Sequence, residues 1–364
     1  MANSYQEAGV NYDQLDALKR FAQMAARETD GNLPPGISGV ADSRGESAFV
    51  IDVGPFYLAT VQEGLGTKNL IAEALGTPEE THFDKIGRDT VAMIVNDLIT
   101  VGARPLWVNA HWAFGSSQFL EGNPEKGPDL ARGWAAACNE AGAVYAAGET
   151  PILKGIIYPE TVELSGSGVG IIEPKSRLTL GDRLQAGDHI VLIESNGIHA
   201  NGLTLVRDVA AMLPDGYQTR LSDGQTFGET ILNPTHVYVK LQQEVFAHGL
   251  DVHYMVHITG HGWRKLMRAN RDFTYRMFTV PDPQEEFGLM QQTGGISDEE
   301  MYNTFNMGTG FAFMLSAKQT QYVVAIAKQQ GLKAWDAGVL EKGPKQVVIE
   351  PKGITYKAET LQIR

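Results

Sequence analysis

Residues 60–105 read TVQEGLGTKNLIAEALGTPEETHFDKIGRDTVAMIVNDLITVGARP, and this stretch indicates how the chain is built. A short apolar run ends at Val61 and leads into a loop that contains glycine, threonine and lysine. Glycines let a loop backbone turn tightly and approach a ligand closely. Backbone amides and a lysine ammonium both suit phosphate oxygens. The residues that we expect to contact such a ligand are Gly64, Gly66, Thr67 and Lys68.

Two acidic residues accompany this loop. Glu63 directly precedes the glycines, and Asp97 falls within a helix that we expect over residues 87–101, on its side away from the centre of the apolar stripe. The stripe has helical spacing and consists of Val91, Ile94, Val95, Leu98 and Ile99. Because Mg²⁺ prefers carboxylate oxygens, the combination favours a magnesium–polyphosphate site. The alternative is a glycine turn followed by a helix with solvated acids, and the loop lacks the G-x-x-x-x-G-K-[ST] spacing of a P-loop.

A further acidic residue follows another predicted strand. Residues 144–147 are expected to form a strand that runs directly into Gly148, Glu149 and Thr150. A glycine, an acid and a hydroxyl group therefore lie together at a second strand end. This repetition favours the metal-site interpretation, in which Glu63, Asp97 and Glu149 are the predicted ligands of Mg²⁺.

The composition argues against several classes of protein. The 364 residues, of which 43% are hydrophobic, are enough for two domains with a real core. A net charge of −13 argues against a nucleic-acid partner, and no apolar run approaches the ~18 residues of a membrane span. The single cysteine, Cys138, excludes an internal disulfide and is expected to be a packed thiol on a helix. With polar sequence at the start of the chain, we expect a cytoplasmic protein.

Strands and helices alternate along both halves of the chain, which predicts an α/β fold with α+β layers. Residues 162–172 place glycine and serine at alternate positions, as in a strand against which another backbone packs closely. A polar connector follows, so we place a domain boundary near residue 173. The predicted domains are residues 1–173 and 174–364. Residues 4–10 have the composition of a mobile arm that is able to dock.

Histidines mark two loops of the second half. A predicted strand ends at Ile193 and leads through a Ser/Gly/His/Asn loop into a helix from Leu203, a place where α/β folds bind ligands. His199 in this loop is a candidate general acid–base or phosphate contact, and the alternative is a histidine that caps the helix. His257 and His261 straddle a glycine turn, and their spacing is not a reliable zinc signature.

Taken in order, these motifs resemble the aminoimidazole ribonucleotide synthetases, also called phosphoribosylformylglycinamidine cyclo-ligases. The patterns of that family include D-G-V-G-T-K, I-G-x-D-x-V-A-M-x-V-N-D-L, G-G-E-T, H-I-T-G-G-G and F-N-M-G-x-G. The matching segments extend over nearly the whole chain, and they are residues 5–10, 63–68, 86–106, 148–150, 196–202, 257–262 and 305–310.

The resemblance implies two α/β domains, with the N-terminal sheets pairing into a barrel across a homodimer. It also implies an enzyme of purine biosynthesis that uses ATP and Mg²⁺. ATP would phosphorylate the formyl-derived oxygen of formylglycinamidine ribonucleotide, a nitrogen of the same molecule would attack, and phosphate would leave. The task of such an enzyme is mainly positioning and charge neutralisation.

The resemblance further implies roles for individual residues. The implied catalytic residues are Asp97, His199 and His257. The implied nucleotide-binding residues are Gly64, Gly66, Thr67, Lys68, Asn201 and Thr259. The implied metal ligands are Glu63, Asp97 and Glu149.

Several positions depart from the family pattern. Glu63 replaces an aspartate and so lengthens a metal ligand by one methylene group, and further changes lie in ligand loops at Ala147, Asn196, Ala200 and His261. These changes leave two alternatives open: a related ATP-dependent kinase or ligase acting on another small substrate, and a non-catalytic nucleotide-binding paralogue. A selenophosphate synthetase would need a cysteine or selenocysteine near the glycine loop, and this chain has none there.

Overall fold

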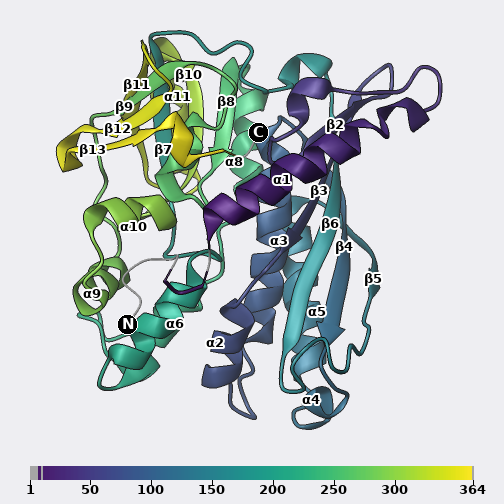
Figure 1. Ribbon diagram of the computed structural model, residues 1–364, viewed down its shortest axis with the longest axis vertical. Helices are drawn as coiled ribbons and strands as arrows, with labels where there is room; N and C mark the ends of the chain where they lie inside the picture. The colour runs from purple at the N-terminus through teal and green to yellow at the C-terminus, as the bar shows by residue number, and fades with distance from the viewer. Residues whose placement is uncertain (1–6, 10, 363–364) are drawn as a thin grey trace.

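The computed structural model describes residues 7–9 and 11–362, so most of the arm expected at residues 4–10 lies outside the described residues. Two separate β-sheets, each packed with helices, meet along a long central helix, α3 (Phe83–Thr100; Figure 1). The predicted mixed α/β class is confirmed. Within the described part of the chain, no helix has the length and apolar character to cross a membrane.

The first sheet, within the described residues, has six strands in the order β1–β2–β3–β6–β4–β5. Neighbouring strands run antiparallel except β4 and β5, which are parallel. The strands are β1 (Ser38–Gly39), β2 (Phe49–Asp52), β3 (Tyr57–Gly64), β4 (Arg104–Phe114), β5 (Val144–Glu149) and β6 (Val162–Ile172). The helices of this half, besides α3, are α1 (Tyr12–Arg27), α2 (Lys68–Leu75), α4 (Gln118–Glu121) and α5 (Lys126–Ala141).

Glycines in β6 allow α3 to lie directly on this sheet. A Cβ atom at Gly168 would lie 2.5 Å from Cγ2 of Ile94 and 3.0 Å from Cδ1 of Leu98, so a larger residue would push the helix away. The close backbone approach expected from the glycine pattern of residues 162–172 is thus present. Helix α3 begins four residues before the predicted start at 87, and the Thr81 hydroxyl just ahead of it accepts a hydrogen bond from the Phe83 amide (3.2 Å).

The second sheet, in the same described part of the chain, has seven strands in the order β13–β12–β9–β11–β7–β10–β8. Neighbours run antiparallel except β12 and β9. The strands are β7 (Asp188–Glu194), β8 (Val252–His257), β9 (Phe273–Met277), β10 (Thr309–Ser316), β11 (Ala334–Lys342), β12 (Gln346–Ile349) and β13 (Ile354–Lys357). The helices are α6 (Leu203–Met212), α7 (Phe227–Ile231), α8 (Val239–Ala247), α9 (Glu285–Gly294), α10 (Asp298–Thr304) and α11 (Thr320–Gln329).

Polar side chains of α3 fasten the second half of the chain to the first. Oδ1 of Asp89 accepts hydrogen bonds from the amide (2.8 Å) and the hydroxyl (2.6 Å) of Thr235. Asn96 donates to the carbonyl of His236 (2.7 Å) and accepts from the amide of Tyr238 (2.9 Å). Both α3 side chains are fully buried. Asp89 and Asp97 of this helix are both buried, so these two are not the solvated acids of the alternative interpretation.

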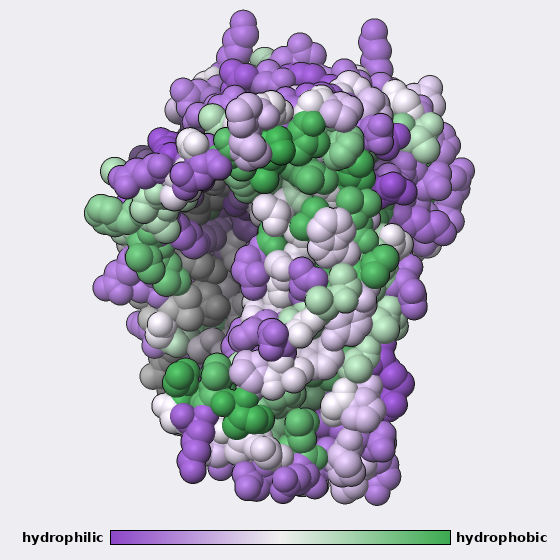
Figure 2. Space-filling model, turned by 90° about the vertical axis from the view of Figure 1, so that its right-hand side faces the viewer, coloured by the Kyte–Doolittle hydropathy of each residue, from purple (hydrophilic) through white to green (hydrophobic). Residues whose placement is uncertain are grey.

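The face of the first sheet that lies opposite α3 is only partly covered. Along β6, the residues that face α3 are buried, whereas the alternate residues from Glu163 to Ile171 are only half-buried. Strand β5 forms one edge of the sheet and is exposed along its whole length. Figure 2 views the side of the molecule on which β4, β5 and β6 lie, and apolar and weakly polar residues are spread over it. The described residues thus leave room for a partner on this face.

Candidate active site

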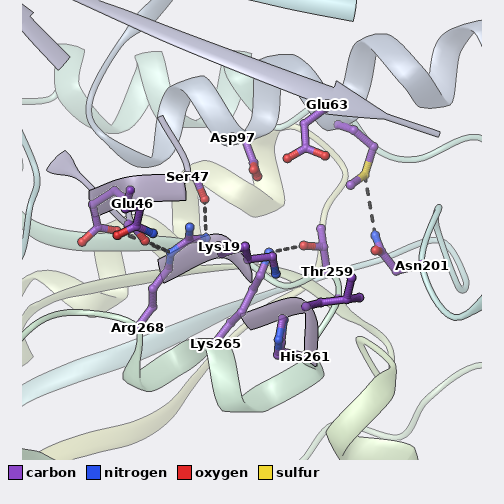
Figure 3. A pocket seen from close by; sticks show the side chains of 15 residues that line it. Lys19, Glu46, Ser47, Glu63, Asp97, Asn201, Thr259, His261, Lys265 and Arg268 are labelled. Atoms are coloured by element: carbon purple, nitrogen blue, oxygen red, sulfur yellow. Dashed lines mark hydrogen bonds and ion pairs between the residues drawn. The ribbon is translucent and has the colours of Figure 1, made fainter. Parts of the chain in front are cut away.

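A pocket of about 490 Å³ lies where both halves of the chain meet, beside α3 and the end of β3 (Figure 3). Its residues come from α1, the segment before β2, β3, α3, the loop before α6 and the segment that follows β8. They are Leu15, Lys19, Gln23, Gly45, Glu46, Ser47, Glu63, Met93, Asp97, Asn201, Thr259, Gly260, His261, Lys265 and Arg268. Four of the expected site residues therefore meet here, and they are Glu63, Asp97, Asn201 and Thr259.

Two carboxyl groups lie side by side on one wall of this pocket. Glu63 is the penultimate residue of β3, and Asp97 is on the last turn of α3. Burial, together with the negative charge of Asp97, raises the pKa of Glu63 to about 8. Burial also acts to raise the pKa of Asp97, but the hydrogen bond from His257 and the charge of Lys265 outweigh it and hold that pKa low. At neutral pH the pair therefore holds one proton, mainly on Glu63.

His257 supports this pair from behind. Its Nδ1 donates to Oδ1 of Asp97 at 2.7 Å, and its ring is buried. The other ring nitrogen, Nε2, is buried with no hydrogen-bond partner among the described residues. Burial lowers the pKa of His257, so the ring is neutral at physiological pH. His257 is not among the residues that line the pocket, and its contact with the carboxyl pair is the hydrogen bond that orients Asp97.

Basic residues that we did not predict form the other wall of the pocket. Lys265, in the 3₁₀ helix Gly262–Met267, donates to the hydroxyl of Thr259, and burial lowers its pKa to about 8. Arg268 donates to the carbonyl of Gly45 (3.0 Å) and to the hydroxyl of Ser47 (2.8 Å). The sequence signal for both was the run of basic residues WRKLMR at 263–268, which directly follows the loop of residues 257–262.

Helix α1 closes one side of the pocket and brings Lys19 to it. Nε2 of His261 lies 3.3 Å from Oδ2 of Asp16 on this helix. His261 has a φ of 69°, a conformation that L-residues seldom adopt. Burial lowers the pKa of His261 to about 4, so the ring is neutral and donates to the aspartate. His261, which departs from the family pattern, therefore tethers α1 to the loop of residues 257–262.

The glycine loop of residues 64–68, which directly follows Glu63, lies beside the pocket. Gly66 has a φ of 75°, as a tight turn requires, and nothing approaches the place where its Cβ would be. The Thr67 hydroxyl lies 3.4 Å from the hydroxyl of Thr204. Gly64, Gly66 and Thr67 directly follow Glu63, but none of them lines the pocket.

Lys68 differs most from its expected place. Its side chain is fully buried and forms an ion pair with Asp89 at 2.8 Å. It also donates to the backbone carbonyls of His199 (3.0 Å) and Asn233 (2.9 Å). In this arrangement the ammonium faces the interior and is surrounded by acceptors, so the expected contact with phosphate stays a prediction.

His199 is likewise buried and does not line the pocket. Its φ is 64°, and its Nε2 donates to Oδ1 of Asn196 at 2.9 Å. Burial and neighbouring positive charge hold its pKa well below the usual value, so the ring is neutral. The departure at Asn196 therefore orients this histidine, and its imidazole does not open onto the carboxyl pair.

Glu149 lies far from the other predicted metal ligands within one chain. Across the sheet, Glu63 pairs with Gly166, Gly166 with Ala110, and Ala110 with Gly148. Three strand spacings therefore separate the two acids, which is about 14 Å. Among the described residues, no three His, Cys, Asp or Glu side chains are grouped so that they could hold a metal ion.

Comparisons with known proteins agree with the motifs. The family described as AIR synthase related protein, N-terminal domain, matches residues 45–172, and the corresponding C-terminal domain matches residues 185–350. The phosphoribosylformylglycinamidine cyclo-ligase of Carboxydothermus hydrogenoformans is 34% identical, over 95% of this chain and 98% of its own length. The enzyme of the same name from Pyrococcus furiosus is 32% identical, over 97% of this chain and 99% of its own.

Solved structures show the same fold at low identity. The hydrogenase maturation protein HypE in complex with ATP has a TM-score of 0.58 and 17% identity, covering 83% of this chain and 84% of its own. AaThiL complexed with AMPPCP and TMP has a TM-score of 0.57 and 13% identity, covering 86% of this chain and 90% of its own. The resemblance seen in the motifs is thus confirmed, and the chain belongs to the AIR synthase related family.

Proposed function

We propose that this protein is an ATP-dependent phosphoribosylformylglycinamidine cyclo-ligase. The observation that carries the proposal is a pocket with paired carboxyl groups on one wall and two basic residues on the other, Lys265 and Arg268. That arrangement suits transfer of a phosphoryl group, in which negative charge must be neutralised and two reactants aligned. The curated relatives of the same length carry this name, which supports the choice of substrate.

The carboxyl pair fits a magnesium ion that is shared with a nucleotide. Glu63 retains a proton at neutral pH because Asp97 lies beside it, and a divalent cation placed between two such groups would release that proton. Mg²⁺ is commonly held by one or two carboxylates while phosphate oxygens and water complete the octahedron. Glu63 and Asp97 would hold such an ion together with the nucleotide, and the bound ion would supply charge neutralisation to the phosphates.

The reaction follows from the chemistry of the substrate. The γ-phosphoryl group of ATP passes to the formyl-derived oxygen of formylglycinamidine ribonucleotide, and ADP is released. The substrate's own nitrogen then attacks the activated carbon, the C–O bond breaks, and phosphate leaves with the oxygen. Thr259 and Asn201, which line the pocket, would orient polar groups of the ligands, and His257 holds Asp97 in position.

We assign the partly covered face of the first sheet to a homodimer. Edge strand β5 is exposed, and the half-buried residues of β6 need a partner to complete their burial. Two such sheets, one from each copy, would pair into the barrel expected from the sequence. Glu149 would then contribute only to the metal site of the second copy, because within one chain it lies three strand spacings from Glu63. The domain limits near residue 173 and the cytoplasmic location remain predictions.

Incubation of the purified protein with formylglycinamidine ribonucleotide, ATP and Mg²⁺ tests this function. Formation of aminoimidazole ribonucleotide and ADP in equal amounts is the expected result. Release of ADP only with another acceptor, such as thiamine monophosphate, would support a related kinase. Nucleotide binding with no turnover of any acceptor would support a non-catalytic paralogue. Either result would overturn the proposed reaction.

A further inference from the structure

Two lysines of this chain are buried at the junction of its halves, but only one of them is satisfied. The ammonium of Lys68 has three partners: an ion pair with the carboxylate of Asp89 and hydrogen bonds to two backbone carbonyls. Lys265 is only 8% exposed, yet among the described residues its ammonium has one hydrogen-bond acceptor, the hydroxyl of Thr259. Two N–H donors of Lys265 are therefore left over.

The unused donors of Lys265 face a ligand space. The side chain lines the pocket, and Figure 3 shows its amino group near Thr259 on the side that faces the carboxyl pair. Its charge acts on both Glu63 and Asp97, but it forms a direct ion pair with neither among the described residues. A buried ammonium with unused donors is costly unless a bound ligand completes its hydrogen bonds.

The other basic groups of the pocket are already engaged. Arg268 donates to Gly45 and Ser47 and lies 3.8 Å from Glu46. Lys19 forms an ion pair with Asp16 at 3.1 Å, and its side chain is 47% exposed. Among the described basic residues of this pocket, Lys265 is thus the buried one whose N–H donors most lack acceptors.

We infer that Lys265 is a catalytic residue that binds the terminal phosphoryl group of the nucleotide. The inference rests on the proposed use of ATP at the carboxyl pair. A metal ion held by Glu63 and Asp97 would neutralise part of the charge of the phosphates, and the rest of that charge would fall to the basic residues of the pocket. Lys265, beside both acids, donates its two unused N–H groups to oxygens of the terminal group and neutralises the charge of the group as it transfers. The diphosphate product lacks this group, so it loses these contacts.

Titration calorimetry with Mg²⁺ and either AMPPCP or ADP tests the role of Lys265. Lys265→Met is expected to weaken AMPPCP binding by about tenfold to a hundredfold, because charge-assisted hydrogen bonds are lost, and to change ADP binding by about twofold or less. Lys265→Arg should restore most of the affinity for AMPPCP. Lys240→Met is the matched control, since Lys240 is an exposed lysine of α8 outside the pocket.

Equal losses for AMPPCP and ADP, or no loss for either, would overturn the assignment of Lys265. If Lys265→Met does not fold, Thr259→Val provides the test, because it removes the one acceptor that orients the ammonium. Thr259→Val should weaken the binding of AMPPCP by about threefold and leave the binding of ADP nearly unchanged. A parent protein that binds neither nucleotide overturns the inference as well. A parent that binds AMPPCP through Lys265 but forms no aminoimidazole ribonucleotide overturns only the proposed reaction.

Discussion

The ammonium of Lys68 lies 2.8 Å from the carboxylate of Asp89, and both side chains are completely buried. The other oxygen of Asp89 holds Thr235, and the other donors of Lys68 hold the carbonyls of His199 and Asn233. One ion pair thus joins the glycine loop, α3 and two loops of the second half. Its position indicates a role in holding the two halves in register at the pocket.

Lys68→Met is expected to destabilise the protein by about 3–5 kcal/mol, because it leaves the Asp89 carboxylate buried without its partner. The double variant Lys68→Met with Asp89→Asn should lose less, since no uncompensated charge remains. Denaturant-induced unfolding measures both changes. A Lys68→Met protein of normal stability that fails to bind nucleotide would instead support the phosphate contact expected from the sequence.

Glu63→Gln is expected to raise stability while it abolishes magnesium-dependent nucleotide binding. The pKa of Glu63 is raised to about 8, so the folded state binds its proton more tightly than the unfolded chain does. Stability is therefore lost as the pH rises from 4.5, the ordinary pKa of a glutamate, towards 8. Replacement by glutamine removes this loss. Allowing for partial exposure, we expect a gain of roughly 1–2 kcal/mol at pH 8.

Thermal unfolding of the parent and Glu63→Gln from pH 5 to pH 8 measures this gain, and calorimetry with Mg²⁺·AMPPCP measures the loss of binding. Glu163→Gln is a suitable control, since Glu163 is a carboxylate on the other face of the same sheet region. A Glu63→Gln protein that binds the nucleotide as tightly as the parent does would remove Glu63 from the metal site.

A buried carboxyl group elsewhere is expected to make stability depend on pH. Burial raises the pKa of Glu286 to about 7, and a Cβ on Gly197 would lie 2.9 Å from its Oε1. Because this pKa is raised, the contribution of protonated Glu286 to stability is fully present below pH 4.5. That contribution is lost as the pH rises towards 7. The shift corresponds to about 3 kcal/mol. Glu286→Gln should remove that slope, as chemical denaturation at pH 4.5, 6 and 7.5 would show; an unchanged slope would assign the dependence to another group.

Replacement of His261 by glycine is expected to loosen α1 with little change in global stability. Glycine relieves the backbone strain at a φ of 69°, but it removes the hydrogen bond to Asp16. Hydrogen exchange of amides in residues 14–27 should become several times faster, because the helix loses its tether to the loop of residues 257–262. Asp16→Asn should produce a similar change through the same contact. Unaltered exchange in both variants would mean that other contacts fix the helix.

Patterns of regular spacing were predicted well from the sequence. The apolar stripe of α3 and the glycine alternation of β6 are local signals, and the structure shows these two elements packed on each other. Glu63 and Asp97 were predicted together as metal ligands from their residue types, and both line the same pocket, while their binding of a metal ion stays a prediction.

Features that depend on distant partners were not predictable in the same way. A glycine loop that ends in Lys68 is compatible with a phosphate contact or a buried ion pair, and the partner, Asp89, lies 21 residues further on. Glu149 shared a local pattern with Glu63, but strand order places it at the far edge of the sheet. Lys265 lies in a short 3₁₀ helix. Which of its side chains face the pocket depends on tertiary packing and not on a periodic pattern in the sequence.

The burial of Cys138 makes this chain well suited to site-specific labelling. Its thiol is 2% exposed, and burial raises its pKa to about 12, so it is a poor nucleophile at neutral pH. As it is the single cysteine of the chain, a second one introduced at Leu18, which is 64% exposed on α1, would react alone with a maleimide. A fluorophore placed there would report directly on movement of the helix that borders the pocket.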